Sequence, residues 1–388
     1  MINLHHTDWR KPMQHNKIQT LTTSLLTGSI LLLTATFVFL PKHDFSENEN
    51  RYLASIPAFS LENVKSGQYM EDINAWLSDH FPLRDFFMGL KTDTEMIWGK
   101  REINNVYIAA DDYLIEVYDA PANTQRIADT FSKFYEKIDT SKINTHLMLV
   151  PTANYTLRNK LPKNAPTRNQ MDTANAIYEQ SGIPAIDCSS FLAKASATSP
   201  IYYRTDHHWT TYGAYQGYLA YCDALGLTPV LLDSLNAQTV TNEFYGTIYS
   251  KVNDYRHAAD SITIYTNPAD SLTVSYFDSK EVSDSLYNPD YLNKKDKYSL
   301  FLDNLHTLIE ITNDNATSDS ELVLIKDSYA NCMVPFLAHH YKKIYVFDTR
   351  YYKEGPSAFI EEHPSITDVL LLYNMNTIDT DSGIRGIY

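Results

Sequence analysis

The chain opens with a long segment that carries no charged side chain. Residues 18–40 are uncharged and largely apolar, and a helix of that length extends about 34 Å, enough to cross the roughly 30 Å hydrocarbon core of a bilayer. Basic side chains precede this segment and acidic ones follow it: Arg10, Lys11, Lys17, and then Asp44, Glu47 and Glu49. The positive-inside rule predicts a single-pass anchor in the cell membrane, with residues 1–17 cytoplasmic and the main domain outside. A cleaved signal peptide and a buried soluble helix are the alternatives.

The spacing of apolar positions changes after this segment. Residues 41–100 show helical spacing, interrupted by a proline-containing stretch at 79–85, which predicts a juxtamembrane helical region. From residue 101 to 388, short apolar strands alternate with helix-length segments. The expected strands are 105–109, 113–117, 145–150, 184–187, 321–325, 343–347 and 368–373, and the expected helices are 124–138, 169–180 and 210–225. This alternation predicts an α/β domain with a largely parallel sheet and helices on both faces.

Residues 240–310 depart from this alternation. Three stretches rich in β-type residues, 240–249, 261–265 and 271–277, lie between polar turns, and helical periodicity is weak there. We therefore expect a β-rich insertion at about residues 240–310, between two parts of the α/β core.

Composition narrows the classes of function. The formal net charge is −15 and no basic stripe is present, so a nucleic-acid partner is excluded because the surface repels phosphates. The three cysteines, Cys188, Cys222 and Cys332, form no C-x-x-C pair. Their odd number argues against a disulfide framework, although the sequence leaves one bridge open.

Two short segments carry candidate catalytic side chains, and the first contains Asp206 and His208, just before the expected helix 210–225. Residues i and i+2 of an extended loop project in the same direction. The Asp206 carboxylate can therefore hold the His208 imidazole in one tautomer, as the acid of a Ser-His-Asp triad does. Taken alone, an Asp-x-His loop is more often a surface or structural feature.

The second segment places Ser328 after the expected strand 321–325, at the start of an expected helix that ends near His340. Ligands bind at that edge of open α/β sheets, and helix N–H groups there stabilise a developing oxyanion. A serine hydroxyl needs a base to become a nucleophile, and His208 is the expected base. An Asp-Ser pair after a strand is, by itself, more often a helix cap.

Metal binding is the competing chemical interpretation. The candidate ligands are Asp206, His207, His208, His339 and His340. No H-x-x-x-H or H-E-x-x-H spacing is present, and adjacent histidines of a helix point in different directions. We therefore predict neither a metal site nor a cofactor.

The residues Asp206, His207, His208 and Trp209 form the motif that names the DHHW family. The chain resembles that family and, with it, the alginate O-acetyltransferase-like branch of the SGNH hydrolases. Other segments contribute to the resemblance, which spans roughly residues 42–388: Glu49-Asn50-Arg51 with Leu53, residues 79–85, Phe244-Tyr245-Gly246-Thr247 and residues 326–331.

The resemblance implies an SGNH-hydrolase-like domain of the flavodoxin-like, three-layer type. The Asp-x-His segment precedes the serine segment, which is a circularly permuted order. Asp206 corresponds to the acid, His208 to the base and Ser328 to the nucleophile. Asn376, with Asn374 as the alternative, corresponds to the asparagine that donates to the oxyanion.

Three positions depart from the family pattern. Lys326 stands where a glycine usually precedes Asp-Ser, position 374 is not glycine, and Ala110-Asp111-Asp112 replaces an expected glycine-rich turn. These departures concern the oxyanion side of the site more than the triad.

The resemblance also implies acyl-ester chemistry on a cell-envelope or exported polysaccharide, by an O-acetyltransferase or an acetylesterase. A glycan is the expected acceptor, and a membrane-embedded partner is the expected acyl donor. The alternative is a non-catalytic envelope scaffold or polysaccharide-binding protein on the same fold.

Four residues near the motifs are expected to bind substrate: Trp209, Tyr329, Asn331 and Asn374. Exposed aromatic rings such as Trp209, Tyr202 and Tyr203 can stack on sugar rings. The equally weighted alternative is that these three rings fill the core around the loop.

Overall fold

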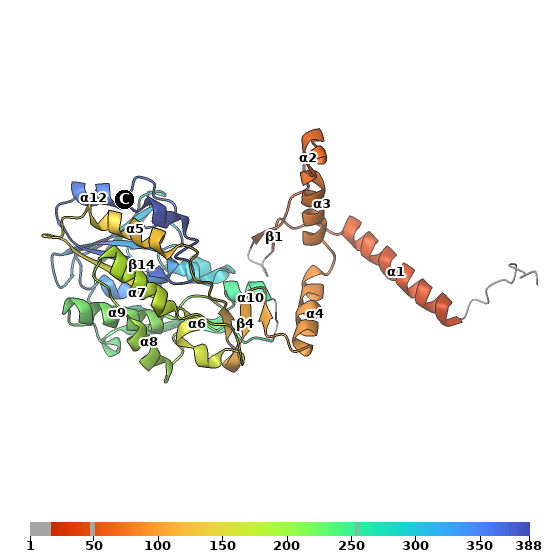
Figure 1. Cartoon of the computed structure of the whole chain (residues 1–388), viewed down its shortest axis with the longest axis horizontal. Helices are drawn as coiled ribbons and strands as arrows, with labels where there is room; N and C mark the ends of the chain where they lie inside the picture. The colour runs from red at the N-terminus through yellow and green to blue at the C-terminus, as the bar shows by residue number, and fades with distance from the viewer. Residues whose placement is uncertain (1–16, 47–50, 253, 255) are drawn as a thin grey trace, which may run out of the picture. The chain divides into compact units, whose positions relative to one another are not determined.

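A computed structural model describes residues 17–46, 51–252, 254 and 256–388 (Figure 1). The described residues form two compact units, which meet between Leu90 and Lys91 in the sequence. Of the predicted cytoplasmic segment, residues 1–16 lie outside the described residues, and so do Glu47, Glu49 and Asn50.

The first unit begins with one long apolar helix, α1 (Lys17–Phe39). It has 23 residues, none of them buried, and it is long and apolar enough to cross a membrane. The Thr34 hydroxyl donates to the Ile30 carbonyl one turn earlier, which satisfies this polar group within the helix. A membrane anchor and a signal sequence both meet these criteria.

The rest of the first unit consists of short elements: β1 (Phe45–Ser46), β2 (Arg51–Tyr52), α2 (Leu61–Ser66), α3 (Gln68–Asp79) and the first part of α4 (Arg84–Ile97). The Arg51 guanidinium donates to both carboxylate oxygens of Asp79, at 2.9 and 2.5 Å, and the Ala54 N–H donates to Asp79 at 2.8 Å. The hydrogen bonds from Arg51 lower the pKa of Asp79. This bidentate pair joins β2 to the end of α3.

The second unit is built on a seven-stranded sheet with the strand order β10-β9-β11-β13-β12-β14-β6. The strands are β6 (Asn144–Val150), β9 (Leu272–Tyr276), β10 (Val282–Ser283), β11 (Leu308–Asn313), β12 (Glu321–Lys326), β13 (Lys343–Phe347) and β14 (Ile366–Asn374). β6, β14, β12 and β13 are parallel, whereas β11, β9 and β10 pair antiparallel. The prediction of a largely parallel sheet is wrong on that side, where β11 runs antiparallel to both β9 and β13. The short turn between β9 and β10 can join only antiparallel neighbours.

The β-rich region therefore divides between two sheets. β7 (Asn236–Phe244) and β8 (Asp260–Thr266) form a separate antiparallel pair, whereas β9, β10 and β11 extend the main sheet. The strand expected at 240–249 ends at Phe244, and α10 (Thr247–Val252) follows it.

Helices cover both faces of the main sheet, as the alternation predicts (Figure 1). On one face, Leu147 and Leu149 of β6 share a hydrophobic cluster with α5 (Thr124–Tyr135) and α7 (Gln170–Ser181). On the other face, Met148 and Val150 join a cluster with α8 (Ser189–Ser196) and α9 (Thr211–Leu225). Alternate residues of one strand thus enter two different cores, which is the period-2 geometry of a strand buried on both sides.

The remaining elements are short. β3 (Glu102–Ile103), β4 (Val106–Ile108) and β5 (Leu114–Glu116) form a small antiparallel sheet. The short helices are α6 (Ala153–Thr156), α11 (Val334–Leu337) and α12 (Pro356–Glu362). Two of the 3₁₀ helices are η5 (Lys297–Leu300) and η6 (Ser328–Cys332). The strand expected at 184–187 is a single bridge between Ala185 and Leu147.

Candidate active site

The loop that contains Asp206 and His208 is held by a buried carboxylate from β8. Asp260 accepts hydrogen bonds from the backbone N–H groups of Arg204 (3.0 Å) and Thr205 (2.8 Å), and from the Thr205 hydroxyl (2.6 Å). Burial raises the pKa of Asp260, and these hydrogen bonds oppose the rise. The backbone that enters the loop is therefore fixed by a residue that the sequence did not single out.

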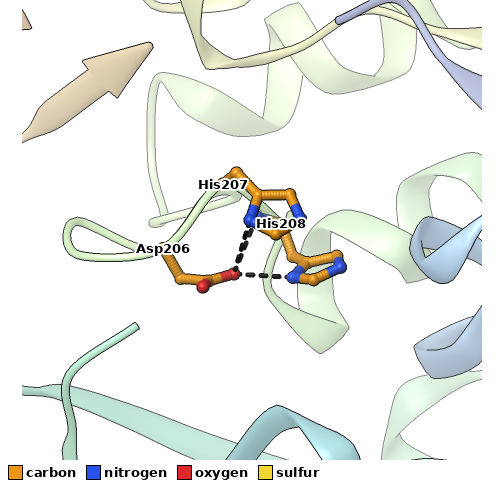
Figure 2. A group of neighbouring side chains, drawn as sticks. All are labelled: Asp206, His207 and His208. Atoms are coloured by element: carbon orange, nitrogen blue, oxygen red, sulfur yellow. Dashed lines mark hydrogen bonds and ion pairs between the residues drawn. The ribbon is translucent and has the colours of Figure 1, made fainter. Parts of the chain in front are cut away.

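Within the loop, Asp206 and His208 project toward each other (Figure 2). Asp206 Oδ1 lies 2.6 Å from His208 Nδ1 and also accepts the His208 backbone N–H at 3.0 Å. A carboxylate only accepts hydrogen bonds, so His208 Nδ1 carries the proton and Nε2 presents a lone pair. The i, i+2 spacing thus brings the two side chains to the same side of the loop.

Ser328 meets this lone pair from a distant part of the chain. Its Oγ lies 2.8 Å from His208 Nε2, across 120 residues of sequence. Asp327 directly follows β12, and Ser328 opens η6. Asp327 caps the N-terminus of η6 by accepting the Tyr329 N–H at 2.9 Å. Asp206 and His208 are buried, whereas Ser328 is half-buried. One continuous series of hydrogen bonds therefore joins Asp206, His208 and Ser328.

The single helix expected after Ser328 is not present. The 3₁₀ helix η6 is followed by the separate short helix α11, which has a proline in its first turn. Pro335 has no N–H to donate to a preceding turn, so it starts a helix rather than continuing one.

Burial and the neighbouring polar groups together set the protonation of Asp206 and His208. Burial, followed by the neighbouring His207, lowers the pKa of His208 to about 4, while Asp206 opposes the change. For Asp206, burial raises the pKa, but His207, His208 and hydrogen bonds from His208 outweigh burial and leave the pKa well below its usual range. At neutral pH the pair is therefore a carboxylate and a neutral imidazole, the form in which Nε2 can accept a proton.

The second oxygen of Asp206 is held by Thr247. Its backbone N–H (2.9 Å) and its hydroxyl (3.0 Å) both donate to Asp206 Oδ2. A Cβ at Gly246 would lie 2.2 Å from the Asp206 Cβ, so only a glycine permits this approach. The segment from Phe244 to Thr247 contributed to the family resemblance without a role, and its place against Asp206 supplies one.

The two motif segments are also joined to each other. Trp209 Nε1 donates to the Tyr329 carbonyl at 2.8 Å, and the Tyr329 hydroxyl donates to the His207 carbonyl. A Cβ at Gly217 of α9 would lie 2.7 Å from the Trp209 ring, so this glycine makes room for the ring. Trp209 thus fastens the Asp206–His208 loop to the turn that carries Ser328.

The aromatic rings expected to stack on sugars lie in the core. Trp209, Tyr202 and Tyr203 are 0%, 1% and 2% exposed. Stacking on a glycan is therefore wrong for these rings, and the alternative, that they fill the core around the loop, is correct. Tyr329, Asn331 and Asn374, which were also expected to bind substrate, are buried as well. Their positions do not support direct contact with a ligand.

The expected oxyanion donors bond to other partners. The Asn374 side-chain amide donates to Asp327 Oδ2 at 2.7 Å and to the Thr377 hydroxyl at 2.8 Å. The Asn376 amide donates to Glu116 Oε2 at 3.3 Å. Among the residues that the structure describes, neither amide is hydrogen-bonded to the triad. Without the family's glycine at position 374, this turn is tied instead to Asp327 and Glu116.

Lys326, which replaces the family's glycine, has its own buried partner. Its ammonium lies 3.7 Å from Asp348 Oδ2, and Asp348 also binds the Arg350 guanidinium. Burial lowers the pKa of Lys326, and Asp348 opposes the change. The lysine charge is therefore balanced by the residue that follows β13.

Tyr298 of η5 is a neighbour of the triad that sequence reasoning missed. Its ring stacks on the His208 imidazole, with ring centroids 3.7 Å apart and planes 9° apart. Its hydroxyl donates to the Ser328 carbonyl at 3.0 Å. No motif surrounds Tyr298 in the sequence, so nothing marked it among the 29 tyrosines.

The residues do not fit a metal ion, although ligand atoms of Asp206, His207 and His208 lie within 4.8 Å of one another. Asp206 already accepts four hydrogen bonds, from His208 and Thr247. His207 Nδ1 bonds to the Thr247 hydroxyl at 2.7 Å, and His208 Nε2 faces Ser328. A metal would have to displace most of this network.

Comparisons with known proteins agree with the motif and the fold. A family model described as DHHW protein matches residues 101–347. The structure is similar to that of a DHHW family protein from Eubacterium siraeum DSM 15702, with 25% identity and a TM-score of 0.63, over 73% of this chain and 96% of that one.

Two structures of Bacillus cereus PatB1 are also similar, and one of them carries a sulfonyl adduct. Each is 19% identical, with TM-scores of 0.62 and 0.60, over 74% and 71% of this chain and 100% and 97% of the PatB1 chains. Among curated proteins, no sequence match is found. The PatB1 likeness establishes a shared fold alone, whereas the family match covers more than half of the sequence and includes the four residues of the motif. The chain belongs to the DHHW family.

Proposed function

We propose that the protein is a serine-dependent acyl-transfer enzyme, with Ser328 as the nucleophile, His208 as the base and Asp206 as the residue that orients the base. The observation that carries this proposal is the series of hydrogen bonds from Asp206 Oδ1 through His208 to Ser328 Oγ, at 2.6 and 2.8 Å. A neutral imidazole at neutral pH supports it, because a base must be unprotonated to act.

The proposed reaction has two halves. His208 Nε2 takes the Ser328 hydroxyl proton while Oγ attacks the carbonyl carbon of an acyl donor. The tetrahedral intermediate then collapses, the bond to the leaving group breaks, and His208 returns the proton to that group. In the second half, an acceptor hydroxyl or water gives its proton to His208 and attacks the acyl carbon. The bond from that carbon to Ser328 Oγ then breaks, and His208 returns the proton to Oγ. Asp206 remains a carboxylate throughout and stabilises the transient imidazolium.

The nature of the acyl group and the acceptor follows from the family resemblance. We propose O-acetyl transfer to, or hydrolysis of acetyl esters on, a cell-envelope or exported polysaccharide, with an acyl donor supplied by a membrane-embedded partner. The Asp-x-His segment precedes Ser328, in line with a circularly permuted SGNH-like domain at residues 101–388 that carries a β-rich insertion.

The proposed placement in the cell rests on α1. We propose that residues 18–40 form an uncleaved single-pass anchor, with the N-terminus in the cytoplasm, and that residues 41–100 form a juxtamembrane region outside. The length and hydropathy of α1 support this placement.

A non-catalytic scaffold on the same fold is the second candidate. The observation that favours it is the engagement of both predicted oxyanion donors with other groups, since an active site needs donors aimed at the developing oxyanion.

Covalent labelling separates the two candidates. An arylsulfonyl fluoride suits this test, because a PatB1 structure carries a sulfonyl adduct. In the reaction, the Ser328 Oγ–S bond forms, fluoride leaves and His208 takes the proton. We expect the full chain in detergent to gain one sulfonyl group by intact mass, and Ser328→Ala to gain none.

Ser299→Ala is the matched control, because Ser299 is a buried serine whose hydroxyl bonds to Asp296 at 2.6 Å. It should label as the unmodified chain does. Folded protein that does not label, or that labels equally in the Ser328→Ala variant, would favour the scaffold.

A further inference from the structure

The position of Tyr298 connects the two residues between which a proton must move. One face of the His208 imidazole is covered by the Tyr298 ring in a parallel stack, at 3.7 Å between centroids. The Tyr298 hydroxyl donates to the Ser328 carbonyl at 3.0 Å and lies 3.2 Å from the Cys332 sulfur. A single side chain therefore contacts the base through its ring and the backbone of the nucleophile through its hydroxyl.

The Tyr298 side chain is held rigidly in this position. It is 4% exposed, and its ring packs against Phe301 and Tyr203 at centroid distances of 5.1 and 6.4 Å. Burial raises the pKa of Tyr298 well above its usual value, so the hydroxyl stays protonated and remains a donor. Its 3₁₀ helix, η5, belongs to the β-rich part of the chain, not to either motif segment.

We infer that Tyr298 is a positioning residue that holds the His208 ring and the Ser328 backbone in register for proton transfer. The inference rests on the proposed function, because it assigns Tyr298 a part in the same step. As His208 takes the Ser328 proton it becomes a cation, and the face of an aromatic ring stabilises a cation placed over it. The hydroxyl fixes the peptide that carries Oγ, so that Oγ stays within reach of Nε2.

Other groups also act on the His208 imidazole, and a test must hold them constant. They are Asp206 and His207 on its own loop, Glu116 at the end of β5, and Tyr329 in η6, whose ring centroid lies 5.4 Å away. None of these residues changes in the variants below, so a shift in the titration of His208 reports on Tyr298.

Two substitutions separate the hydroxyl from the ring. Tyr298→Phe keeps the stack and removes the hydrogen bond to Ser328, and we expect sulfonyl labelling about tenfold slower, the equivalent of one lost hydrogen bond. Tyr298→Leu removes both contacts, and we expect labelling about a hundredfold slower, as misplaced reacting groups typically cost.

The pH dependence of the labelling rate tests whether Tyr298 acts on His208. A purely structural role for Tyr298 would leave the midpoint of that dependence unchanged. In Tyr298→Leu, loss of the aromatic face disfavours the imidazolium and lowers the pKa of His208, whereas entry of water relieves burial and raises it. Burial is the largest cause of the depressed pKa of His208, so the rise exceeds the fall. We therefore expect the midpoint of the rate against pH to rise by about one pH unit in Tyr298→Leu and to stay unchanged in Tyr298→Phe.

Tyr287→Phe is the matched control. This variant also loses a tyrosine hydroxyl that donates a hydrogen bond, here to the Tyr265 carbonyl at 2.6 Å, in the same region of the chain. Unlike Tyr298, Tyr287 does not stack on His208. The variant should label at the rate of the unmodified chain. If the unmodified chain labels and Tyr298→Leu matches it in rate and midpoint, this inference is overturned while the proposed function stands. If Tyr298→Leu labels more slowly but its midpoint does not move, the inference is also overturned. If the unmodified chain never labels, both the inference and the proposed function are overturned.

Discussion

Two parts of the candidate site are held in different ways: the base end, formed by Asp206 and His208, and the predicted oxyanion end, formed by Asn374 and Asn376. At the base end, the Asp206 carboxylate accepts four hydrogen bonds and packs directly on Gly246. At the other end, the family resemblance implies Asn376, with Asn374 as the alternative, as the oxyanion donor, yet their amides bond to Glu116 and Asp327. The difference teaches that a pairing set by spacing within one loop carries over from sequence to structure. A role that depends on a distant partner is less secure: Ser328 does reach His208 across 120 residues, but Asp327 and Glu116 accept hydrogen bonds from the two asparagine amides.

Gly246→Ala gives the largest expected effect, because it disrupts the base end of the site, where Asp206 is held by four hydrogen bonds. The added Cβ would overlap the Asp206 side chain, so the acid must move. We expect sulfonyl labelling of Ser328 to slow by about a hundredfold and the free energy of unfolding to fall by about 1–3 kcal/mol. Urea denaturation and intact mass measure these effects.

Gly386→Ala serves as its control, since the nearest heavy atom to a Cβ there is 3.9 Å away. Unchanged labelling in Gly246→Ala would mean that the close approach to Asp206 has no role in holding the acid.

Acid titration comes next and sharpens the account of the base. The folded pKa of His208 is about 4, below the 6.5 of a free imidazole. Labelling should therefore persist at pH 5 and fall tenfold per unit below about pH 4, because only the neutral ring accepts a proton. A midpoint near 6.5 would contradict the burial of His208.

The same depressed pKa has a consequence for stability. Between pH 6.5 and 4 the unfolded chain binds a proton at His208 that the folded chain does not. Stability is therefore lost as the pH falls through this interval, by roughly 3 kcal/mol for this residue. Denaturant midpoints at pH 7 and pH 4.5 measure this loss together with that of His340, whose pKa burial also lowers to about 4.

Asn376→Ala gives the smallest expected effect and tests the other end. The Asn376 amide bonds to Glu116, so we expect acyl transfer or labelling to change by less than about threefold, whereas loss of an oxyanion donor costs 10²–10³-fold. A loss of a hundredfold would restore the donor role and remove the contrast between the two ends.

Local pattern predicted much of the fold. The strands at β6, β12, β13 and β14 match continuous apolar runs, since strands buried on both faces need no alternation. The helix α9 was expected at 210–225, and it is observed at Thr211–Leu225, where the Thr210 side chain caps it by accepting the Gly213 N–H at 3.1 Å. The antiparallel half of the sheet was missed, because direction depends on connections rather than on hydrophobicity.

The residues of the candidate site also fall into a predictable and an unpredictable group. Asp206, His208 and Ser328 could be proposed from residue type, spacing and family pattern. The sequence did not indicate the roles of Asp260, Thr247 and Tyr298. Each acts through a few contacts with residues distant in the sequence, and such contacts produce no recognisable sequence pattern. The stacking role given to Trp209 failed, since residue type does not reveal whether a ring lies inside or outside.

The 120 residues between His208 and Ser328 have a consequence for biosynthesis. A ribosome finishes the loop with the imidazole long before it reaches the hydroxyl, and domains generally fold in the order in which they emerge. An unfinished or prematurely terminated chain that stops before β12 lacks the hydroxyl and also three of the four parallel strands, so the site cannot form in it. Reactivity can begin only when nearly the whole polypeptide has been made and the last parallel strands have docked.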